Sequence, residues 1–248
     1  VISRGLSLAF REKIKPSRVV RRLISLNPDA TVFAIKRRRS VFLGATPESL
    51  LSARNGELSV DCIAASSQRS DDAGADEAFG SGLLTDPKSS REHRMVVQAA
   101  VSALSPISSR IEVPSAPVLK KLRSIQHLYT PLKATLLHPD DIWVAAQALW
   151  PNPAIGGDPR DVATRWISRF ENQDRGWYTG VVGVLSANRN DADLVVGIRS
   201  GLIRGNAAVV YAGCGIVQGS KPRDELEETR WKLRTMAAAL EVEPQEDW

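Results

Sequence analysis

The sequence predicts an α+β fold of mainly antiparallel sheets flanked by helices. Short extended segments are joined by connections of hairpin length, and helical segments are inserted between groups of strands. The composition is that of an ordinary globular protein, because 43% of the 248 residues are hydrophobic and 25% are charged. No fixed-period repeat, low-complexity segment or internal linker interrupts the chain. We therefore expect a single domain over residues 1–248.

The N-terminal half is predicted to be rich in strands. A helix comes first, over 16–26, where apolar residues recur at helical spacing until an Asn-Pro-Asp segment ends it. Four extended segments and a polar stretch follow, and an Asn-Gly pair predicts a hairpin between the last two strands. The expected strands are 31–36, 41–44, 49–53 and 57–65, and residues 67–82 are expected to form a loop with or without a short helix.

The C-terminal half is predicted to mix helices with strands. Asp86 and Pro87 suit an N-cap and a first helical residue, so a helix is expected from there to residue 104. Prolines break the chain at 114–117, and three more make 150–159 a rigid loop. The remaining expected elements are strands over 128–137, 179–185, 194–203 and 207–212, and helices over 140–149, 160–170 and 221–240.

The composition favours a cytoplasmic protein. No apolar run approaches the length of a membrane span, and Cys62 and Cys214 lack metal-ligand spacing, so we expect reduced thiols and no membrane partner. The net charge of +5 suits either nucleic acid or an acidic metabolite. However, the basic cluster at 36–39 lies between apolar runs without interleaved aromatic residues. We interpret it as a solvated hairpin tip and expect no nucleic-acid partner.

The most informative stretch is 211–232, an apolar strand followed by a small-residue turn and a helix. Glu225, Glu228 and Lys232 have the spacing i, i+3, i+7, which puts their side chains on one helix face. Two carboxylates and an ammonium beside a glycine-containing turn can hold a divalent ion together with an anionic ligand. Glu92, far away in sequence, could complete the metal cage. The alternative is that these charges are solvated, as charged helix faces usually are.

Six segments look like the segments of a known pattern, in the same order along the chain: 42–50 (FLGASPE), 88–93 (KDRxEH), 126–130 (QHLxT), 175–180 (RGxYxG), 198–200 (the IR segment) and 211–232 (AGxGIV…S.P..E..ET..K). Together they resemble the chorismate-utilising enzymes, which include isochorismate, salicylate, anthranilate and aminodeoxychorismate synthases. The resemblance covers almost the whole chain and implies the anthranilate synthase component I-like fold. Residues 151–154 are similar to the HPTPA segment of isochorismate and salicylate synthases, which favours water over ammonia as the nucleophile.

The resemblance implies a Mg²⁺-dependent site for chorismate, a cyclohexadiene that carries two carboxylates. Glu48 matches the general acid, and its apolar neighbours would keep the carboxyl poorly solvated and protonated near neutral pH. Glu92 and Glu228 match the metal ligands, and Glu225 matches an acid that binds through water. The substrate-binding residues implied are Ser66, His127, Thr130, Ala154, Tyr178, Arg199, Gly213, Gly215 and Lys232.

Arg199 follows an alternating segment, so it is expected to project from a strand and to bind both oxygens of the enolpyruvyl carboxylate with its forked guanidinium. The hydroxyl of Tyr178 and the backbone N–H groups of the two glycines can add hydrogen bonds there, and Lys232 is expected to close the site. Arg199 could instead form a cross-strand ion pair, and His127 could be a structural histidine.

The chain also departs from the family pattern. The general-base lysine of the family would fall immediately before Val1, which starts inside a strand-like segment, so we expect an N-terminal portion to be missing from this sequence. A family glycine is Ala65 here and a family arginine is Gln68, and the alanine restricts φ where glycine would not. In the HPTPA-like segment Trp150 replaces the histidine and Asn152 the threonine.

These observations lead to one main hypothesis and two alternatives. The main hypothesis is an isochorismate synthase-like isomerase that acts on chorismate with Mg²⁺ and supplies siderophore or menaquinone synthesis. The alternatives are a salicylate synthase-like enzyme that uses the same residues, and a non-catalytic chorismate-binding relative, favoured by the missing base. The oligomeric state is left open.

Overall fold

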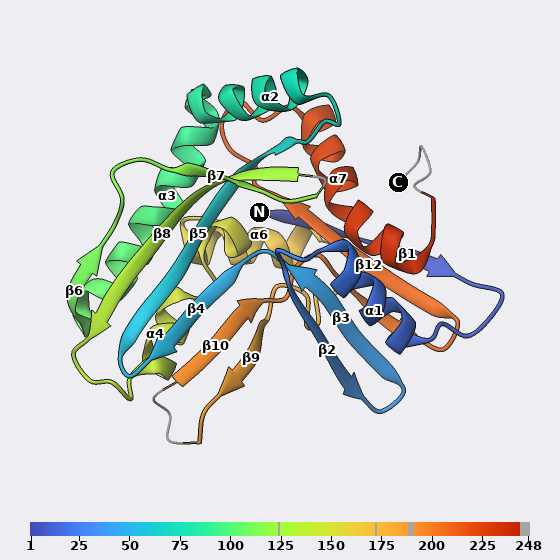
Figure 1. Cartoon of the computed structure of the whole chain (residues 1–248), viewed down its shortest axis with the longest axis horizontal. Coiled ribbons are helices and arrows are strands. Elements are labelled where there is room, and N and C mark those ends of the chain that lie inside the picture. The colour runs from blue at the N-terminus through green and yellow to red at the C-terminus, as the bar shows by residue number, and fades with distance from the viewer. Residues whose placement is uncertain (124, 172, 188–190, 244–248) are drawn as a thin grey trace.

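The computed structural model describes residues 1–123, 125–171, 173–187 and 191–243, and over these residues the strands form two antiparallel sheets that diverge from a common junction (Figure 1). The smaller sheet contains β1 (Ile2–Ala9), β2 (Thr31–Arg37), β3 (Ser40–Thr46), β11 (Ser200–Arg204) and β12 (Ala207–Cys214). The larger sheet contains β4 (Ser49–Arg54), β5 (Glu57–Gln68), β6 (Ser108–Glu112), β7 (Val118–Lys121), β8 (Ile125–Leu136), β9 (Val181–Leu185) and β10 (Asp191–Val196).

Several strands that are neighbours in a sheet are far apart in the sequence. The strand orders are β1-β12-β11-β3-β2 in the smaller sheet and β6-β8-β5-β4-β10-β9 in the larger one, where β7 also pairs with β8. The helices are α1 (Pro16–Leu26), α2 (Ala73–Thr85), α3 (Pro87–Leu104), α4 (Ile142–Leu149), α5 (Pro153–Gly156), α6 (Arg160–Phe170) and α7 (Pro222–Leu240), with a 3₁₀ turn over Ser105–Ile107. Among the described residues, no helix combines the length and apolar character needed to cross a bilayer.

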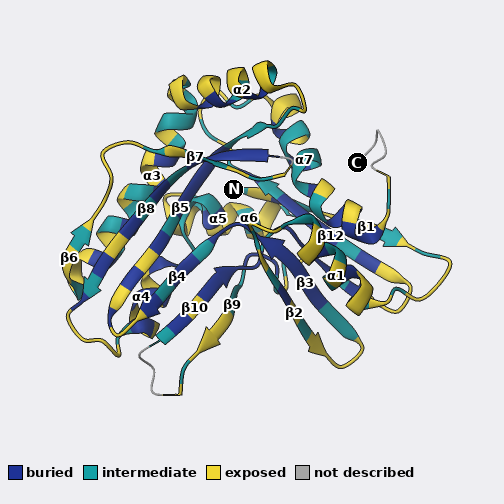
Figure 2. Cartoon of the chain, viewed as in Figure 1, coloured by how far each residue is buried: buried dark blue, intermediate teal, exposed yellow. Residues whose placement is uncertain are grey.

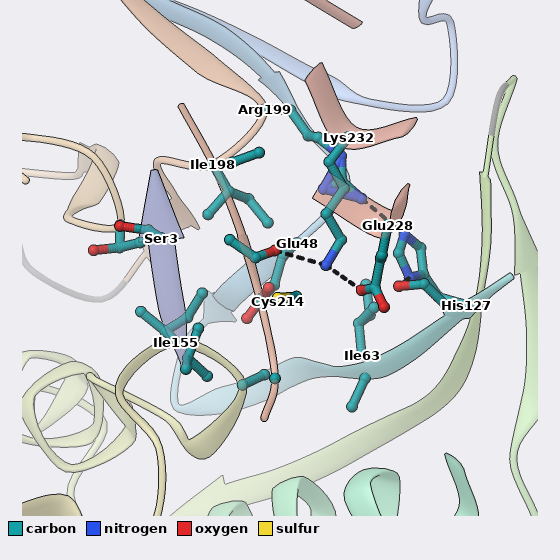
Figure 3. Close-up of a pocket in the computed structure, with 18 of the residues that line it drawn as sticks. Ser3, Glu48, Ile63, His127, Ile155, Ile198, Arg199, Cys214, Glu228 and Lys232 are labelled. Carbon is teal, nitrogen blue, oxygen red and sulfur yellow. Dashed lines mark hydrogen bonds and ion pairs between the residues drawn. The ribbon is translucent and has the colours of Figure 1, made fainter. Parts of the chain in front are cut away.

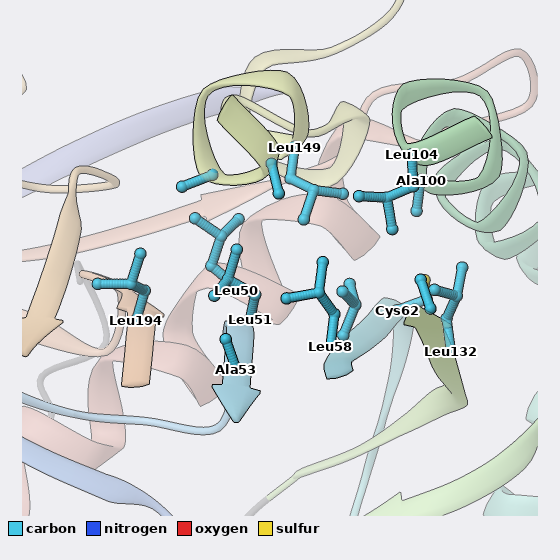
Figure 4. Packing of buried hydrophobic residues seen from close by; sticks show 14 of the residues in the cluster. Leu50, Leu51, Ala53, Leu58, Cys62, Ala100, Leu104, Leu132, Leu149 and Leu194 are labelled. Atoms are coloured by element: carbon cyan, nitrogen blue, oxygen red, sulfur yellow. The ribbon is translucent and has the colours of Figure 1, made fainter. Parts of the chain in front are cut away.

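Each sheet buries one face under its own helices. Leu51 and Leu132 of the larger sheet pack with Leu104 of α3 and with α4 in a core whose side chains are fully enclosed (Figure 4). Val210 of the smaller sheet packs with α1 and α7 through Leu233 and its neighbours. Burial is therefore concentrated under the helices and near the junction of the two sheets, whereas the outer ends of β2 and β9 are exposed (Figure 2).

The chain crosses from one sheet to the other twice, at the same place. Residues 47–48 connect β3 to β4, and residues 197–199 connect β10 to β11. Backbone hydrogen bonds join the two crossings: Val196 N donates to Glu48 O at 3.1 Å, and Ala45 N donates to Arg199 O at 3.2 Å. The junction between the sheets therefore carries one acidic and one basic predicted site residue.

Many predicted elements are confirmed. The α+β class with antiparallel sheets is correct, helices α1, α3 and α6 have the predicted bounds within one residue, and the Asn-Gly pair forms the turn between β4 and β5. The basic cluster forms the exposed tip of the β2–β3 hairpin. Both cysteines are free and buried.

Two predictions were wrong. Residues 67–82 are not mainly a loop, because α2 runs for 13 residues from an N-cap at Asp72, whose side chain accepts from Ala75 N at 2.8 Å. Its glycines concealed it, and one of them, Gly80, allows close packing, because a Cβ there would lie 2.7 Å from the side chain of Leu119 of β7. The predicted strand 194–203 is two strands in different sheets. The sequence reading also missed β6 and β7, which are short.

Candidate active site

A cleft lies at the junction of the two sheets. Its walls come from the two crossings, β1, β5, β8, β12, α5, the 175–179 loop, and the helices α3 and α7. Figure 3 shows Glu48, Arg199, His127, Glu228 and Lys232 pointing toward one another from these elements. All but two of the predicted site residues line the cleft: Glu48, Ser66, Glu92, His127, Ala154, Tyr178, Arg199, Gly213, Gly215, Glu228 and Lys232.

Glu48 is the most deeply buried acid of the cleft, with 4% of its surface exposed. Burial raises its pKa to about 7, although the amide of Asn152 and the charge of Arg199 act in the opposite direction. A carboxyl group with this pKa is partly protonated at neutral pH and can therefore donate a proton. The predicted poorly solvated setting is confirmed.

The raised pKa of Glu48 leads to a prediction about the stability of the protein that can be tested without ligands. Unfolded Glu48 ionises near its ordinary pKa of about 4.3, whereas folded Glu48 keeps its proton up to about 7, so its contribution to stability is present at low pH and lost as pH rises through 7. We expect Glu48→Gln to gain stability relative to the unchanged protein, by about 3 kcal/mol between pH 4 and pH 8. Urea unfolding of both proteins across this range measures the difference.

Comparing the two proteins removes the contribution of other buried groups, such as His93, whose pKa burial lowers to about 4. Glu57→Gln, at the exposed start of β5, is the matched control for the loss of a carboxyl group. A pH-independent difference between Glu48→Gln and the unchanged protein would mean that Glu48 ionises normally in the folded protein.

Arg199 is buried at the second crossing rather than on a strand, which corrects the sequence prediction. Its backbone has a φ of 49°, in the left-handed region that non-glycine residues rarely adopt. Among the described residues no carboxylate pairs with it, and its Nη2 instead contacts Nε2 of His127 at 3.1 Å. The predicted cross-strand ion pair is therefore absent from the described residues, and a buried guanidinium remains to receive an anion.

His127 is held as a neutral acceptor for Arg199. Its Nδ1 lies 3.0 Å from the carbonyl oxygen of Ala65, so the Nδ1 proton is donated there and Nε2 is left to accept from the guanidinium. Burial and the positive charge of Arg199 lower its pKa well below the usual value. Tyr178 lies nearby, stacked on Tyr211 with ring centroids 5.1 Å apart, and burial raises its pKa.

The charged face of α7 is turned into the protein, so the solvated alternative is excluded. Glu225 is buried and accepts from Nζ of Lys88 at 2.7 Å, and Lys232 pairs with Glu228 at 2.5 Å while donating to the carbonyl of Gly213 at 2.9 Å. Glu92 approaches this face from α3. Burial, followed by the charge of Glu228, raises its pKa to about 7.

The predicted metal ligands are neighbours but are not gathered into a cage. Within the described ranges, no three His, Cys, Asp or Glu side chains are grouped so that they could hold a metal ion as they stand. Glu225 does not line the cleft, because its carboxylate is turned to Lys88. Thr130 does not line the cleft either, because its hydroxyl contacts His93 at 2.8 Å on the other face of β8. Ser66 lines the cleft and contacts His127.

Ala65 confirms the conformational expectation. It has a φ of 57° at a bulge between β5 and β8, so alanine occupies a position that suits glycine. Thr179 in the same cleft wall also has a positive φ, of 66°. Such backbone conformations cost energy and persist only where the surrounding structure holds them in place. They are found most often at functional sites.

The sequence reading missed the role of Asn152. The sequence identified Asn152 only as the residue that replaces a family threonine, yet its Nδ2 donates to Glu48 Oε1 at 2.8 Å. Its position between two prolines signals a rigid loop, but the pattern does not show where the loop points. Trp150 also has a structural role, since its Nε1 donates to the carbonyl of Thr179 at 2.7 Å.

The fold and cleft define an α+β protein with a buried acid, an unpaired arginine and clustered carboxylates, a site suited to a small polyanionic ligand. A family model for chorismate binding enzymes matches residues 1–241, and the chain belongs to this family. It is 41% identical to the salicylate biosynthesis isochorismate synthase of Pseudomonas aeruginosa, over 92% of this chain and 48% of that protein.

Two solved structures confirm the predicted fold. The crystal structure of DhbC from Bacillus anthracis, described as a 2,3-dihydroxybenzoate-specific isochorismate synthase, is 34% identical with a TM-score of 0.94, over 98% of this chain and 66% of that one. Anthranilate synthase component I from Streptococcus pneumoniae is 31% identical with a TM-score of 0.80, over 95% of this chain and 52% of that one. The chain spans about half the length of the curated relatives it matches.

Proposed function

We propose that this chain is a chorismate-binding domain that converts chorismate to isochorismate. The observation that carries the proposal is the buried, partly protonated Glu48 in the same cleft as the unpaired Arg199. The family match supports the substrate class, and the two relatives named as isochorismate synthases support this member of it. Eleven of the thirteen predicted site residues line the same cleft, which supports the proposal.

In this proposal, Glu48 protonates the departing C4 hydroxyl of chorismate, which leaves as water, while another water adds at C2 and loses a proton to a base. Arg199 forms paired hydrogen bonds with the enolpyruvyl carboxylate, and the hydroxyl of Tyr178 adds another. Lys232 and His127 are already bonded to Glu228 and Arg199, so we assign the base to neither.

The carboxylates fit a magnesium ion by their chemistry. Mg²⁺ prefers oxygen ligands and keeps several waters. Burial, followed by repulsion from Glu228, raises the pKa of Glu92, and a divalent cation would relieve that repulsion. Glu92 and Glu228 would hold the ion, with Glu225 contributing through water. When bound, the ion would neutralise and orient the ring carboxylate of chorismate.

Product analysis tests the proposed function. Chorismate is incubated with the protein and Mg²⁺, and products are identified by NMR. Isochorismate supports the proposal. Salicylate with pyruvate would assign the chain to the salicylate synthases, and calorimetric binding of chorismate without product would indicate a non-catalytic relative. Neither binding nor turnover would contradict the proposed substrate.

Gly215 allows a specific test of the magnesium ligands. A Cβ at this position would lie 2.6 Å from Glu92 Oε1, so Gly215→Ala is expected to displace this flexible carboxylate with little effect on folding. We expect Mg²⁺ affinity, measured by calorimetry with chorismate present, to fall about 10- to 100-fold. Gly82→Ala is the control, because a Cβ there meets nothing within 4 Å. Unchanged Mg²⁺ affinity in Gly215→Ala would argue against Glu92 as a ligand.

A further inference from the structure

Asn152 is bonded directly to the carboxyl group of Glu48, although the two residues are 104 positions apart in sequence. Asn152 Nδ2 donates to Glu48 Oε1 at 2.8 Å, and among the described residues this is the one side-chain hydrogen bond to that carboxyl group. The other carboxyl oxygen is left for the cleft, into which Glu48 points (Figure 3).

The orientation of the Asn152 amide is fixed by a second contact. Its Oδ1 accepts from Ile155 N at 3.0 Å, which caps the short helix α5. Because an amide has one oxygen and the cap uses it, the NH₂ group must be the part that faces Glu48. Pro151 and Pro153 restrict the backbone on both sides, and the neighbouring Trp150 anchors the loop to Thr179.

We propose that Asn152 is a positioning residue for the proton donor: it fixes one oxygen of Glu48, directs the other toward the substrate and favours release of the proton. The inference rests on the proposed isomerase function. An N–H donor stabilises the ionised carboxylate, so it opposes the effect of burial on the pKa of Glu48. Arg199 and Lys232 also lower this pKa by their charges, whereas Asp61 on β5 raises it.

The bond matters because an acid is most effective when its pKa is close to the working pH. With burial alone, Glu48 would hold its proton too strongly to give it up readily. With the Asn152 amide in place its pKa is about 7, so the group can both carry a proton and release it.

Three substitutions separate positioning from helix capping. Asn152→Asp keeps an oxygen for the cap but replaces the donor by an acceptor. Asn152→Ala removes both contacts, and Asn152→Thr keeps a hydroxyl that can accept from Ile155 N and donate to Glu48. If Asn152 acts only as a cap, the aspartate variant should behave like the unchanged protein, because asparagine and aspartate are equally good N-caps.

The pKa of Glu48 can be measured without substrate. Proteins labelled with ¹³C at the glutamate carboxyl carbon are titrated by NMR, and the Glu48 signal is assigned by its loss in Glu48→Gln. We expect the pKa to rise by about one unit in Asn152→Ala, by more in Asn152→Asp, and to return toward the original value in Asn152→Thr. The decline of kcat at high pH should move in the same direction, with KM for chorismate changed less than kcat.

An unchanged Glu48 pKa in both Asn152→Ala and Asn152→Asp, with the proteins folded by thermal melting, would overturn the proposal. This outcome is distinguishable from failure of the proposed function, because the titration contains no chorismate. If the pKa values move as expected but no isochorismate forms, the contact is supported and the assigned reaction is wrong.

Discussion

Glu48→Gln is expected to lower kcat for conversion of chorismate to isochorismate by about 10²- to 10⁴-fold, the usual contribution of a positioned general acid. Glutamine has nearly the shape of protonated glutamic acid, but it has no proton to transfer to the departing hydroxyl. Binding should change little, so the effect should appear in kcat and much less in KM. Steady-state kinetics with product detection by chromatography measures both constants.

The unchanged protein should show the matching pH dependence. Because the protonated form of Glu48 is the active one and its pKa is about 7, kcat should fall as pH rises through that value. Glu57→Gln again provides a control with an exposed acid. Substantial activity in Glu48→Gln would remove this residue from the role of proton donor and leave the cleft without an assigned acid.

Arg199→Lys is expected to weaken chorismate binding by about 10- to 100-fold. Lysine keeps the charge but cannot form the two parallel hydrogen bonds that a guanidinium makes with a carboxylate, and it also loses the contact with His127. The expected loss of chorismate affinity therefore reflects the geometry of the guanidinium group rather than its charge. Calorimetric titration with chorismate, in the presence of Mg²⁺, measures the change.

Arg54→Lys is a suitable control because Arg54 pairs with Asp193 on the exposed part of the larger sheet, away from the cleft. Its substitution should leave affinity unchanged. If Arg199→Lys binds chorismate as tightly as the unchanged protein, the buried guanidinium does not contact a substrate carboxylate. Thermal melting of both variants shows whether the left-handed backbone at position 199 tolerates the replacement.

Local patterns predicted the individual elements well, because the helix stop and start signals around 16–26 and 87–104 act over a few residues. They failed where tertiary contacts override local preference. Helix α2 contains glycines that disfavour a helix, but Gly80 permits close packing against β7. The segment 194–203 was predicted as one strand because a sequence pattern carries no information about which sheet a strand joins.

The candidate site was predictable from the sequence mainly through the family resemblance. The spacing of Glu225, Glu228 and Lys232 correctly placed them on one face, but it could not show that lysines hold two of the carboxylates. The contact between Asn152 and Glu48 joins two loops separated by most of the larger sheet in sequence. No local pattern reports such a contact, since it depends on how the proline-flanked loop approaches the junction.

The paired crossings also have a mechanical consequence. If the two sheets bend relative to each other about their junction, residues at the junction move least and residues at the free strand ends move most. Glu48 and Arg199 both lie on the line where the sheets meet and are linked there through the backbone of their neighbours. Bending between the sheets would therefore leave the separation of acid and guanidinium nearly constant, even as the hairpin tips move apart.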